Sequence, residues 1–546
     1  MSSGRFVTPR PVNEKVRDYG PGSEDKRLLK EELERQRAST IDIPMVIGGK
    51  ELKSGMPGKA VCPHDHGRVL GVYYMGVAEA AGKAIKAAAK AKPEWAAMPW
   101  EDRAAIFLKA ADLLAGPYRY EINAATMLGQ SKTVLQAEID SACELADYLR
   151  FNVAYVCRIY GGQPEYNPAG NWNKLEYRPL DGFVLAICPF NFTSISGNLP
   201  TAPAMMGNTV IWKPATGAVL SARVFMNILM EAGLPDGVIN MVHGNGADIA
   251  NPILDHEDLA GVHFTGSTAT FRGIWGRVGA NLGNGLYRNY PRLVGETGGK
   301  DFVLACPDAD VGALVVALFR GAFEYQGQKC SAASRAYIPR SLWPEVRDGM
   351  AALAERALVG DVLDFRNFMG AVIDRKAFDK VKGYIGDARS SPEAQVAIGG
   401  ECDDKKGYFI WPTVVTTTNP RFRGMAEEIF GPVLTVYVYE DKRFEETLGL
   451  IDGTSPYALT GSVFGKSRAL IRGALDRLVN AAGNIYVNDK PTGAVVGQQP
   501  FGGGRMSGTN DKAGGWFNML RWTSPRAIKE NFLPPCDPFY PHMKEE

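Results

Sequence analysis

The strongest constraint on the fold is an alternation of short apolar runs with helix-length segments after residue 182. The runs have the length and composition of buried strands: Phe183 to Ile187, Thr209 to Trp212, Val238 to Val242, Val262 to Phe264 and Phe302 to Ala305. The segments between them are long enough to connect one parallel strand to the next. The pattern therefore predicts βαβ units around a buried parallel sheet, which is the α/β class.

A second region, from about residue 308 to residue 465, alternates in the same way. It has helical spacing at Leu314–Ala322 and Glu345–Leu358 and a strand-like run at Val433–Val438. Earlier in the chain, Val77–Lys92 and Asp102–Ala115 have the spacing of amphipathic helices. Because 546 residues correspond to roughly two to four domains, we expect two α/β units.

The composition excludes several classes of partner. The 61 Lys and Arg residues balance 60 Asp and Glu residues, so a net charge of +1 gives no general attraction to nucleic acid or an anionic membrane. The charge-free stretch Gly182–Trp212 is long enough to span a bilayer, but Pro189, Pro200 and Pro203 interrupt it, so we expect buried core. Eight cysteines without a CxxC pair and only six histidines predict neither a disulfide framework nor a zinc cluster.

The first forty residues are expected to form an exposed arm with one short helix, because prolines and glycine are mixed there with dense charge. The arm has no apolar segment of the kind found in secretion signals. Glu14 and Asp18 also argue against a cleaved mitochondrial leader, which is normally poor in acidic residues. With the unpaired cysteines, this favours the cytoplasm, or the mitochondrial matrix if the chain is eukaryotic.

Three polar residues stand where chemistry is possible, and each also has a plain structural interpretation. Cys330 follows Gly327 and lies beside Lys329, whose charge could stabilise a thiolate, although most lone cysteines are small buried hydrophobes. Glu296 lies among glycines, where partial desolvation suits a general base, or where it is only a solvated turn residue. Asn191 follows a predicted strand end and offers either an amide donor to a ligand or a helix cap.

Two further strand ends have the chemistry of a nucleotide site. Trp212-Lys213-Pro214 ends one strand with a cation, and the later segment from His263 to Thr268 ends another at a glycine and hydroxyls. A helix that begins there could direct its N–H groups toward a phosphate. Neither segment has the GxGxxG pattern, so the usual dinucleotide motif is absent.

Together, these segments resemble the aldehyde dehydrogenase superfamily, from about residue 45 to residue 530. Each hallmark has a counterpart: PFNF at 189–192, WKP at 212–214, FTGS at 264–267, ETGGK at 296–300, GQKC at 327–330, EEIFGP at 427–432 and PFGG at 500–503. Other segments are similar to the Δ1-pyrroline-5-carboxylate dehydrogenases, or L-glutamate γ-semialdehyde dehydrogenases: FNFT at 190–193, FEYQGQKCS at 323–331, NDKPTGA at 488–494, SGTND at 507–511 and LRWTS at 520–524.

The resemblance implies an enzyme of proline catabolism. It would oxidise L-glutamate γ-semialdehyde, which is in equilibrium with Δ1-pyrroline-5-carboxylate, to L-glutamate with NAD as the cofactor. Cys330 would form a thiohemiacetal and then a thioester, and the Asn191 amide with a backbone N–H at Cys330 would hold the oxyanion. Glu296 would activate the water that hydrolyses the thioester. The resemblance implies no metal.

The resemblance also implies two sets of binding residues. For NAD they are Cys188, Lys213, Gly266, Ser267, Thr268 and Glu428, with Glu428 on the nicotinamide ribose and Lys213 on the adenosine ribose. For the substrate they are Ser331, Gly493, Ala494, Phe192 and Phe501, the first three holding its α-carboxylate. One position departs from the family: NAD-specific members often have an acidic residue where this chain has Thr216, so some use of NADP is not excluded.

The implied fold is an aldehyde dehydrogenase-like α/β fold with two Rossmann-like domains and a protruding β oligomerisation element. The expected parts are an N-terminal arm (1–40), an NAD-binding domain (41–164 and 183–298), a catalytic domain (299–505), and an oligomerisation element with the C-terminal tail (165–182 and 506–546). The tail from Arg521 to Phe532 has the alternation of a strand that adds to a partner's sheet. We therefore expect a homodimer or a higher homo-oligomer.

Other functions were weighed against this one. Another semialdehyde dehydrogenase, such as one for succinate semialdehyde, shares the chemistry but not the amino group of the ligand; the Gly493-Ala494 segment favours glutamate semialdehyde. A catalytically silent relative is a second alternative, against which Cys330, Glu296 and Asn191 argue together. A bifunctional protein with a proline dehydrogenase barrel has no room in 546 residues that the resemblance already covers.

Overall fold

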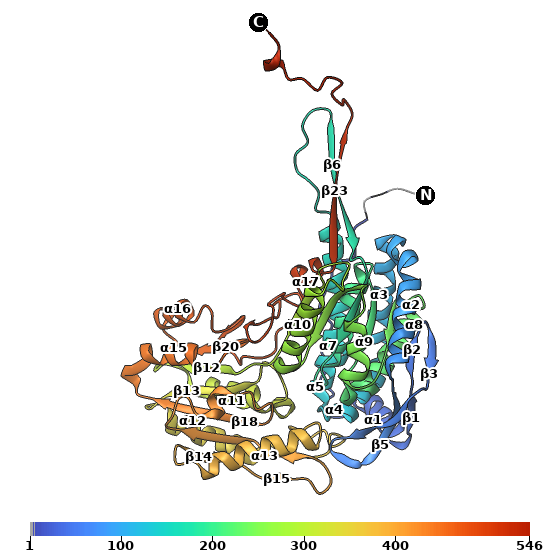
Figure 1. Cartoon of the computed structure of the whole chain (residues 1–546). Helices are drawn as coiled ribbons and strands as arrows, with labels where there is room; N and C mark the ends of the chain where they lie inside the picture. The colour runs from blue at the N-terminus through green and yellow to red at the C-terminus, as the bar shows by residue number, and fades with distance from the viewer. Residues whose placement is uncertain (1–3, 5, 546) are drawn as a thin grey trace.

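The protein has two α/β lobes, and a two-stranded ribbon projects from one of them (Figure 1). This arrangement comes from a computed structural model that describes residues 4 and 6–545. Each lobe is built on one seven-stranded sheet. The predicted α/β class is therefore confirmed.

The first sheet contains the apolar runs that follow residue 182. Its order is β11 (Arg292–Glu296), β10 (Leu259–Thr265), β7 (Phe183–Ile187), β8 (Thr209–Lys213), β9 (Ile239–Met241), β2 (Met45–Ile47) and β3 (Lys50–Leu52). The strands from β11 to β9 are parallel, and β2 and β3 are antiparallel additions at the edge. The predicted strands at β7, β8 and β9 are confirmed within one residue at each end, whereas β10 begins at Leu259, three residues before the predicted start at Val262.

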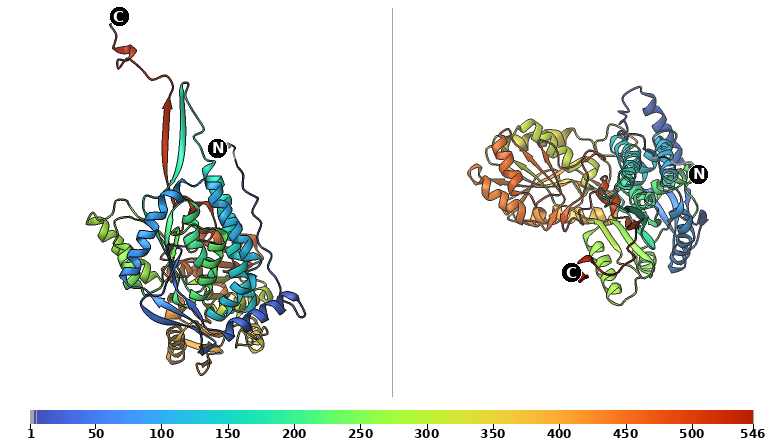
Figure 2. Two further views of the ribbon diagram at one scale, coloured as in Figure 1. Left: turned by 90° about the vertical axis from the view of Figure 1, so that its right-hand side faces the viewer. Right: turned by 90° about the horizontal axis from the view of Figure 1, so that it is seen from above.

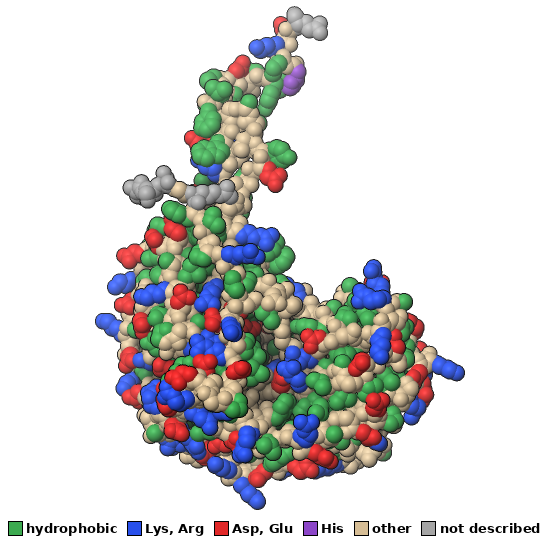
Figure 3. Space-filling model, turned by 180° about the vertical axis from the view of Figure 1, so that it is seen from behind, with side chains coloured by type: hydrophobic (Ala, Val, Ile, Leu, Met, Phe, Trp, Pro, Cys, Tyr) green, Lys and Arg blue, Asp and Glu red, His purple; other side chains and the backbone are tan. Residues whose placement is uncertain are grey.

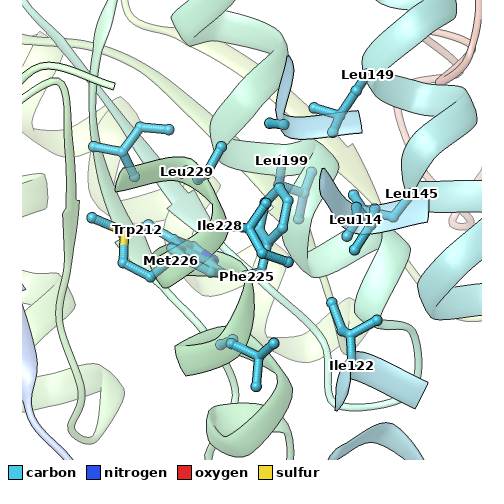
Figure 4. Packing of buried hydrophobic residues seen from close by; sticks show 14 of the residues in the cluster. Leu114, Ile122, Leu145, Leu149, Leu199, Trp212, Phe225, Met226, Ile228 and Leu229 are labelled. Atoms are coloured by element: carbon cyan, nitrogen blue, oxygen red, sulfur yellow. The ribbon is translucent and has the colours of Figure 1, made fainter. Parts of the chain in front are cut away.

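Helices cover both faces of this sheet because side chains of β7 alternate between two cores. Val184 and Ala186 pack with α3 (Trp100–Ala115), α4 (Arg119–Gln130), α6 (Leu145–Tyr160), α7 (Thr193–Met205) and α8 (Val219–Ala232). Figure 4 shows part of this core, where Leu114, Leu145, Leu199 and Phe225 converge. Leu185 packs on the other face with α2 (Ala78–Ala97), α9 (Asn251–Leu254) and α10 (Thr268–Gly283).

The proline-interrupted stretch belongs to the core, as expected. Pro200 and Pro203 lie within α7, and both are buried. Among the described residues, no helix is both long enough and apolar enough to cross a membrane.

The second sheet has the order β14 (Ala394–Ile398), β17 (Thr413–Thr417), β18 (Val433–Tyr439), β13 (Ala333–Pro339), β12 (Asp301–Ala305), β20 (Thr460–Phe464) and β21 (Asn484–Val487). All neighbours are parallel except β14 and β17. Val303 of β12 packs with α11 (Val311–Phe323) and α12 (Trp343–Arg356). Phe302 and Leu304 face the opposite core, with α15 (Phe444–Gly453) and α16 (Arg468–Arg477). A further core lies under α13 (Arg375–Ser390).

The projecting ribbon joins two segments that are far apart in the sequence. Strand β6 (Asn171–Pro179) pairs antiparallel with β23 (Thr523–Asn531) along their whole length. Figures 1 and 2 show the pair standing away from both lobes, with the C-terminal tail beyond it. The strand that pairs with β23 therefore belongs to the same chain. The exposed outer edges of β6 and β23 are available for further contacts.

The N-terminal arm contains the expected helix, α1 (Glu24–Ala38), but it is not wholly peripheral. Tyr19, Leu29 and Leu33 are buried in the core of the first lobe, and α1 lies against α4. A small sheet that the sequence did not predict follows, with the order β1 (Ile41–Ile43), β5 (Asp65–Met75) and β4 (Met56–Cys62). The dense charge of the arm predicts exposure. The few apolar residues that anchor the arm are buried in the core nevertheless.

Short elements complete the chain. They are α5 (Val134–Ala137), the π-helix η1 (Glu138–Glu144), η2 (Thr216–Ala218), η3 (Gly246–Ala250), η4 (Glu324–Gly327), β15 (Cys402–Asp403), β16 (Phe409–Ile410), α14 (Arg423–Ala426), η5 (Asp441–Arg443), β19 (Tyr457–Ala458), β22 (Gly504–Arg505), α17 (Trp516–Leu520) and η6 (Pro541–Met543).

Candidate active site

A cleft of about 920 Å³ lies where the carboxyl ends of the first sheet's strands approach the amino end of β13. The space-filling view shows the surface hollowed between the two lobes (Figure 3). Six predicted site residues line the cleft: Cys188, Asn191, Gly266, Ser267, Cys330 and Glu428. The other eight lie outside its lining: Lys213, Thr268, Glu296, Phe192, Ser331, Gly493, Ala494 and Phe501.

The segment before Cys330 has an unusual backbone. Tyr325 and Gln326 have φ angles of +53° and +54°, in the left-handed region that side chains rarely adopt. The buried Gln326 side chain holds this conformation, because its Nε2 donates to the carbonyls of Ser131 at 2.9 Å and Ala371 at 2.7 Å. Gly327 also has a positive φ, and a side chain there would collide with the Gly431 carbonyl. The loop that presents the thiol is thus fixed by contacts to both lobes.

The surroundings of Cys330 suppress its ionisation. Burial raises the pKa of the Cys330 thiol well above its usual value, and the charges of Asp301, Glu296 and Glu428 act in the same direction. The sequence suggested that the charge of Lys329 could stabilise a thiolate at Cys330. The Lys329 ammonium instead pairs with the Glu324 carboxylate at 3.6 Å. These surroundings therefore favour the thiol form of Cys330 over the thiolate.

Asn191 directs its amide at the same loop. Its Nδ2 donates to the Gln328 carbonyl at 2.9 Å, which uses one of its two N–H groups. The helix cap position of α7 is Phe192, so Asn191 does not act as the cap that was considered as its alternative role. The second amide N–H and the backbone N–H of Cys330, which bonds no other described residue, can both donate to an oxygen on a carbon bound to Cys330.

Glu296 ends β11, and its carboxyl faces the PFGG segment. Oε2 accepts the backbone N–H of Gly503 at 3.1 Å. Burial raises the pKa of this carboxyl well above its ordinary value, while the Gly503 N–H and the charge of Lys512 oppose that rise. The direction is the one expected for a desolvated general base.

The residues expected to hold the cofactor's phosphates and adenosine surround the start of α10 and the end of β8. Ser267 caps α10 by accepting the N–H of Thr270 at 3.1 Å, so the remaining first-turn N–H groups are free for an anion. The Thr268 hydroxyl instead donates to Tyr457, at 3.4 Å. Burial lowers the pKa of Lys213, whose ammonium has no hydrogen bond to a described residue.

Cys188 and Glu428 border the cleft in different ways. Cys188 is buried at the edge of the cleft, and burial raises the pKa of its thiol to about 12. Glu428 Oε1 accepts the N–H of Gly299 at 2.9 Å. A side chain at Gly298 would displace the Glu428 carboxylate from this position.

The expected substrate residues form a neighbouring group. Ser331 Oγ lies 2.8 Å from the hydroxyl of Thr492, at the start of the loop that contains Gly493. Gly493 has a φ of +103°, and the N–H groups of Gly493 and Ala494 bond no described residue. These N–H groups and the Ser331 hydroxyl can therefore donate hydrogen bonds to a carboxylate. Phe501 is tied to Ala513 through its N–H at 2.9 Å.

A buried charged group behind Asn191 was missed by the sequence analysis. Asp140 in η1 accepts the N–H groups of Thr193 and Ser194, both at 2.9 Å, and pairs with Lys132 at 2.6 Å. The Lys132 ammonium also lies 4.1 Å from the centre of the Phe192 ring. The cluster fixes the start of α7 and so the direction of Asn191. Only the density of acidic residues in the otherwise apolar segment 138–147 could have signalled it.

A cysteine thiol, an amide donor, a buried carboxyl and the exposed start of a helix that could bind a phosphate lie in one region of the molecule, an arrangement typical of dehydrogenases that act on aldehydes. The chain belongs to the aldehyde dehydrogenase family, whose sequence profile matches residues 53–528.

Two relatives and one solved structure illustrate the similarity. The mitochondrial delta-1-pyrroline-5-carboxylate dehydrogenase of Dictyostelium discoideum is 52% identical over 539 residues, which cover 99% of this chain and 97% of that protein. The human protein of the same name is 47% identical over 534 residues, with 98% and 94% covered. The delta-pyrroline-5-carboxylate dehydrogenase of Mycobacterium tuberculosis, solved bound with NAD, is 53% identical, has a TM-score of 0.96 and covers both chains completely.

Proposed function

We propose that this chain oxidises L-glutamate γ-semialdehyde to L-glutamate with NAD, as the second step of proline catabolism. The observation that carries the proposal is the set of donors near Cys330: the Asn191 amide bonds the loop just before it, at Gln328, and the next residue, Ser331, contacts Thr492 beside the free N–H groups of Gly493 and Ala494. The names of the relatives support the same substrate. NAD is the cofactor, in agreement with the NAD-bound relative.

The chemistry follows from what each side chain can do. The Cys330 thiol would give up its proton to solvent and attack the aldehyde carbon, and the resulting oxyanion would accept hydrogen bonds from Asn191 and the Cys330 N–H. NAD, when bound, would supply the acceptor for the hydride that leaves this carbon as the thioester forms. Glu296 would take a proton from water, the hydroxide would attack the thioester carbon and break its C–S bond, and the released Cys330 thiolate would take the proton back from Glu296 as glutamate leaves.

The residues present fit a dinucleotide. The unpartnered Lys213 ammonium can bond a ribose hydroxyl, and the free N–H groups at the start of α10 suit a pyrophosphate. The Glu428 carboxylate can accept from both hydroxyls of a second ribose. Thr216 is exposed and uncharged, so this position supplies no repulsion against a 2′-phosphate.

The substrate set favours an amino acid semialdehyde over a simple aldehyde. Ser331, Gly493 and Ala494 supply one hydroxyl and two backbone donors, which satisfy a carboxylate without a buried counter-charge. Phe192 and Phe501 are proposed to flank the aliphatic chain between the carboxylate and Cys330. Succinate semialdehyde has a carboxylate too, and it is the second substrate to compare.

Two variants test the mechanism. Cys330→Ala should abolish NADH formation while NAD binding is retained, because a small residue replaces the covalent catalyst. Glu296→Gln should give a rapid burst of NADH followed by slow turnover, because only the hydrolysis step needs the base. Stopped-flow absorbance measures NADH formation by both variants. Steady turnover by Cys330→Ala within about tenfold of wild type would rule out Cys330 as the nucleophile.

The parts of the chain are proposed to divide the work. Residues 41–164 and 183–298 form the NAD-binding domain, residues 299–505 the catalytic domain, and residues 165–182 with 506–546 the element that joins subunits. Exposed apolar side chains on or beside the ribbon support this last role: Tyr166, Trp172, Phe532 and Leu533. A Trp172→Glu, Leu533→Asp double variant should sediment as a smaller species than wild type, whereas Val479→Asp, which changes an exposed residue of the other lobe, should not.

The compartment is part of the proposal as well. All eight cysteines are free thiols, which suits a reducing environment. We infer the cytoplasm, with the mitochondrial matrix as the alternative because two relatives are named mitochondrial. Imaging of a fluorescent fusion in the source cell distinguishes the two.

A further inference from the structure

The side chain of Asn13 connects three segments that are distant in the sequence. Its Nδ2 donates to Asp147 Oδ2 on α6 and to the backbone carbonyl of Val496, both at 2.8 Å. Its Oδ1 accepts from Gln498 Nε2 at 3.0 Å. A single amide thus joins the N-terminal arm, a helix of the first lobe and the loop 491–500, which we call the carboxylate loop because it contains Gly493 and Ala494.

The arm is itself firmly held at this point. The N–H of Glu14 donates to Asp147 Oδ1 at 2.7 Å. The Glu14 carboxylate bonds Arg119 at 2.8 Å and Arg150 at 2.7 Å, and Arg119 also donates to the Lys15 carbonyl at 2.8 Å. Further along, the buried Tyr19 hydroxyl donates to Glu138 at 2.7 Å. Figure 2 shows the arm from residue 6 to α1 running down the flank of the first lobe.

The carboxylate loop has little support of its own. Gly493 and Gly497 have positive φ angles and are exposed, and the loop's internal bonds lie only between Val495 and residues 498–499. Glycines add conformational freedom, so such a loop would sample many positions without outside contacts. The tie at Val496 is two residues after Ala494, and Val496 is buried. A fixed position of Val496 therefore limits where the Gly493 and Ala494 N–H groups can point.

We propose that Asn13 is a positioning residue for substrate recognition, which holds the carboxylate loop so that its backbone N–H groups are preorganised for the substrate's α-carboxylate. This inference rests on the proposed function for its substrate, but the tie itself does not. Preorganised donors bind a carboxylate without the entropic cost of ordering the loop. The arm thus contributes to specificity although none of its described residues, 4 and 6–40, lines the cleft.

The test compares Asn13→Ala with Lys15→Ala, which changes an exposed side chain on the same arm. Asn13→Ala should raise KM for glutamate γ-semialdehyde about three- to tenfold with kcat within about twofold of wild type, the range for losing modest hydrogen bonds. The kcat/KM for propanal, which has no carboxylate, should stay at the wild-type value. Lys15→Ala should match wild type with both aldehydes.

Hydrogen exchange measures the tie without any substrate. Peptides that cover residues 491–500 should exchange faster in Asn13→Ala than in wild type, while peptides from β7 and β8 should be unchanged. Gln498→Ala removes the bond that Gln498 donates to Asn13, one of the three bonds of the Asn13 side chain. The same peptides should exchange faster in this variant, by a smaller factor. Gln498→Ala replaces Asn13→Ala in the test if Asn13→Ala does not fold.

Two results would overturn the inference: unchanged exchange of the carboxylate loop in a folded variant, or equal losses in kcat/KM for both aldehydes. If wild type itself fails to oxidise glutamate γ-semialdehyde, the proposed function fails. The exchange experiment then still decides whether Asn13 orders the loop.

Discussion

The surroundings of Cys330 disfavour its thiolate form. Burial and three nearby carboxyl groups raise the pKa of its thiol, and Lys329 is engaged by Glu324. A thiol with a raised pKa resists alkylation and oxidation, because the thiolate is the reactive form.

Asp301 offers a direct test of this electrostatic account. Burial raises its own pKa to about 8, so its negative charge appears mainly above that pH and then opposes ionisation of Cys330. Asp301→Asn keeps an oxygen to accept the Thr460 N–H, which the aspartate accepts at 2.6 Å. Removal of the charge should lower the pKa of the Cys330 thiol. The pH profile of iodoacetamide labelling, followed by peptide mapping, should move to lower pH by roughly 1 unit.

The matched control is Glu427→Gln, which removes a carboxylate that bonds Tyr384 instead. Its labelling profile should match wild type. An unchanged profile in Asp301→Asn would show that Asp301 does not influence the nucleophile.

Ser331 tests the substrate end of the site. Its hydroxyl is bonded to Thr492 and is proposed to donate to the α-carboxylate. Ser331→Ala should cost about 1 to 3 kcal/mol in kcat/KM for glutamate γ-semialdehyde, the range for a hydrogen bond to a charged group. Propanal should be much less affected, and equal losses for both would mean that Ser331 supports Cys330 rather than the substrate.

Among the elements, the short π-helix η1 fixes the start of α7. It places Asp140 where one carboxylate satisfies two N–H groups at the start of α7 and the Lys132 ammonium. Both charged residues are about 1% exposed. A π-helical turn changes which side chains face inward, which explains why regular helical spacing did not predict the contact.

Asp140→Ala should therefore destabilise the fold by about 3 to 5 kcal/mol, because it leaves a buried ammonium and two buried N–H groups unpaired. Chemical denaturation measures the free energy of unfolding. Asp112→Ala is a useful control, since Asp112 is exposed and contributes only a surface ion pair with Arg150. A loss no larger than that of the control would contradict the account.

The sequence predicted regular elements better than it predicted irregular ones. Strands such as Phe183–Ile187 follow from apolar runs, and the family resemblance is confirmed. The left-handed turn at Tyr325 and Gln326 could not be predicted, because tertiary contacts to Ser131 and Ala371 hold residues that do not favour it. Contacts of the arm with loop 491–500 were equally hidden, since they join residues more than 480 positions apart.

The whole molecule combines two sheets whose edges meet at one cleft with an arm that crosses the flank of the first lobe (Figures 1 and 2). The thiol comes from the second lobe, while Asn191 and Glu296 come from the first. The site therefore depends on how the lobes are held together, and contacts such as Gln326 to Ser131 contribute to this.

Steady-state kinetics of the wild-type chain with a panel of aldehydes tests the central claim most directly. NADH formation from glutamate γ-semialdehyde, succinate semialdehyde and propanal is measured with NAD, and the product of the first is identified as glutamate. The account predicts the highest kcat/KM for glutamate γ-semialdehyde, with one glutamate formed per NADH. A higher kcat/KM for succinate semialdehyde or propanal, or no NADH from glutamate γ-semialdehyde, would contradict it.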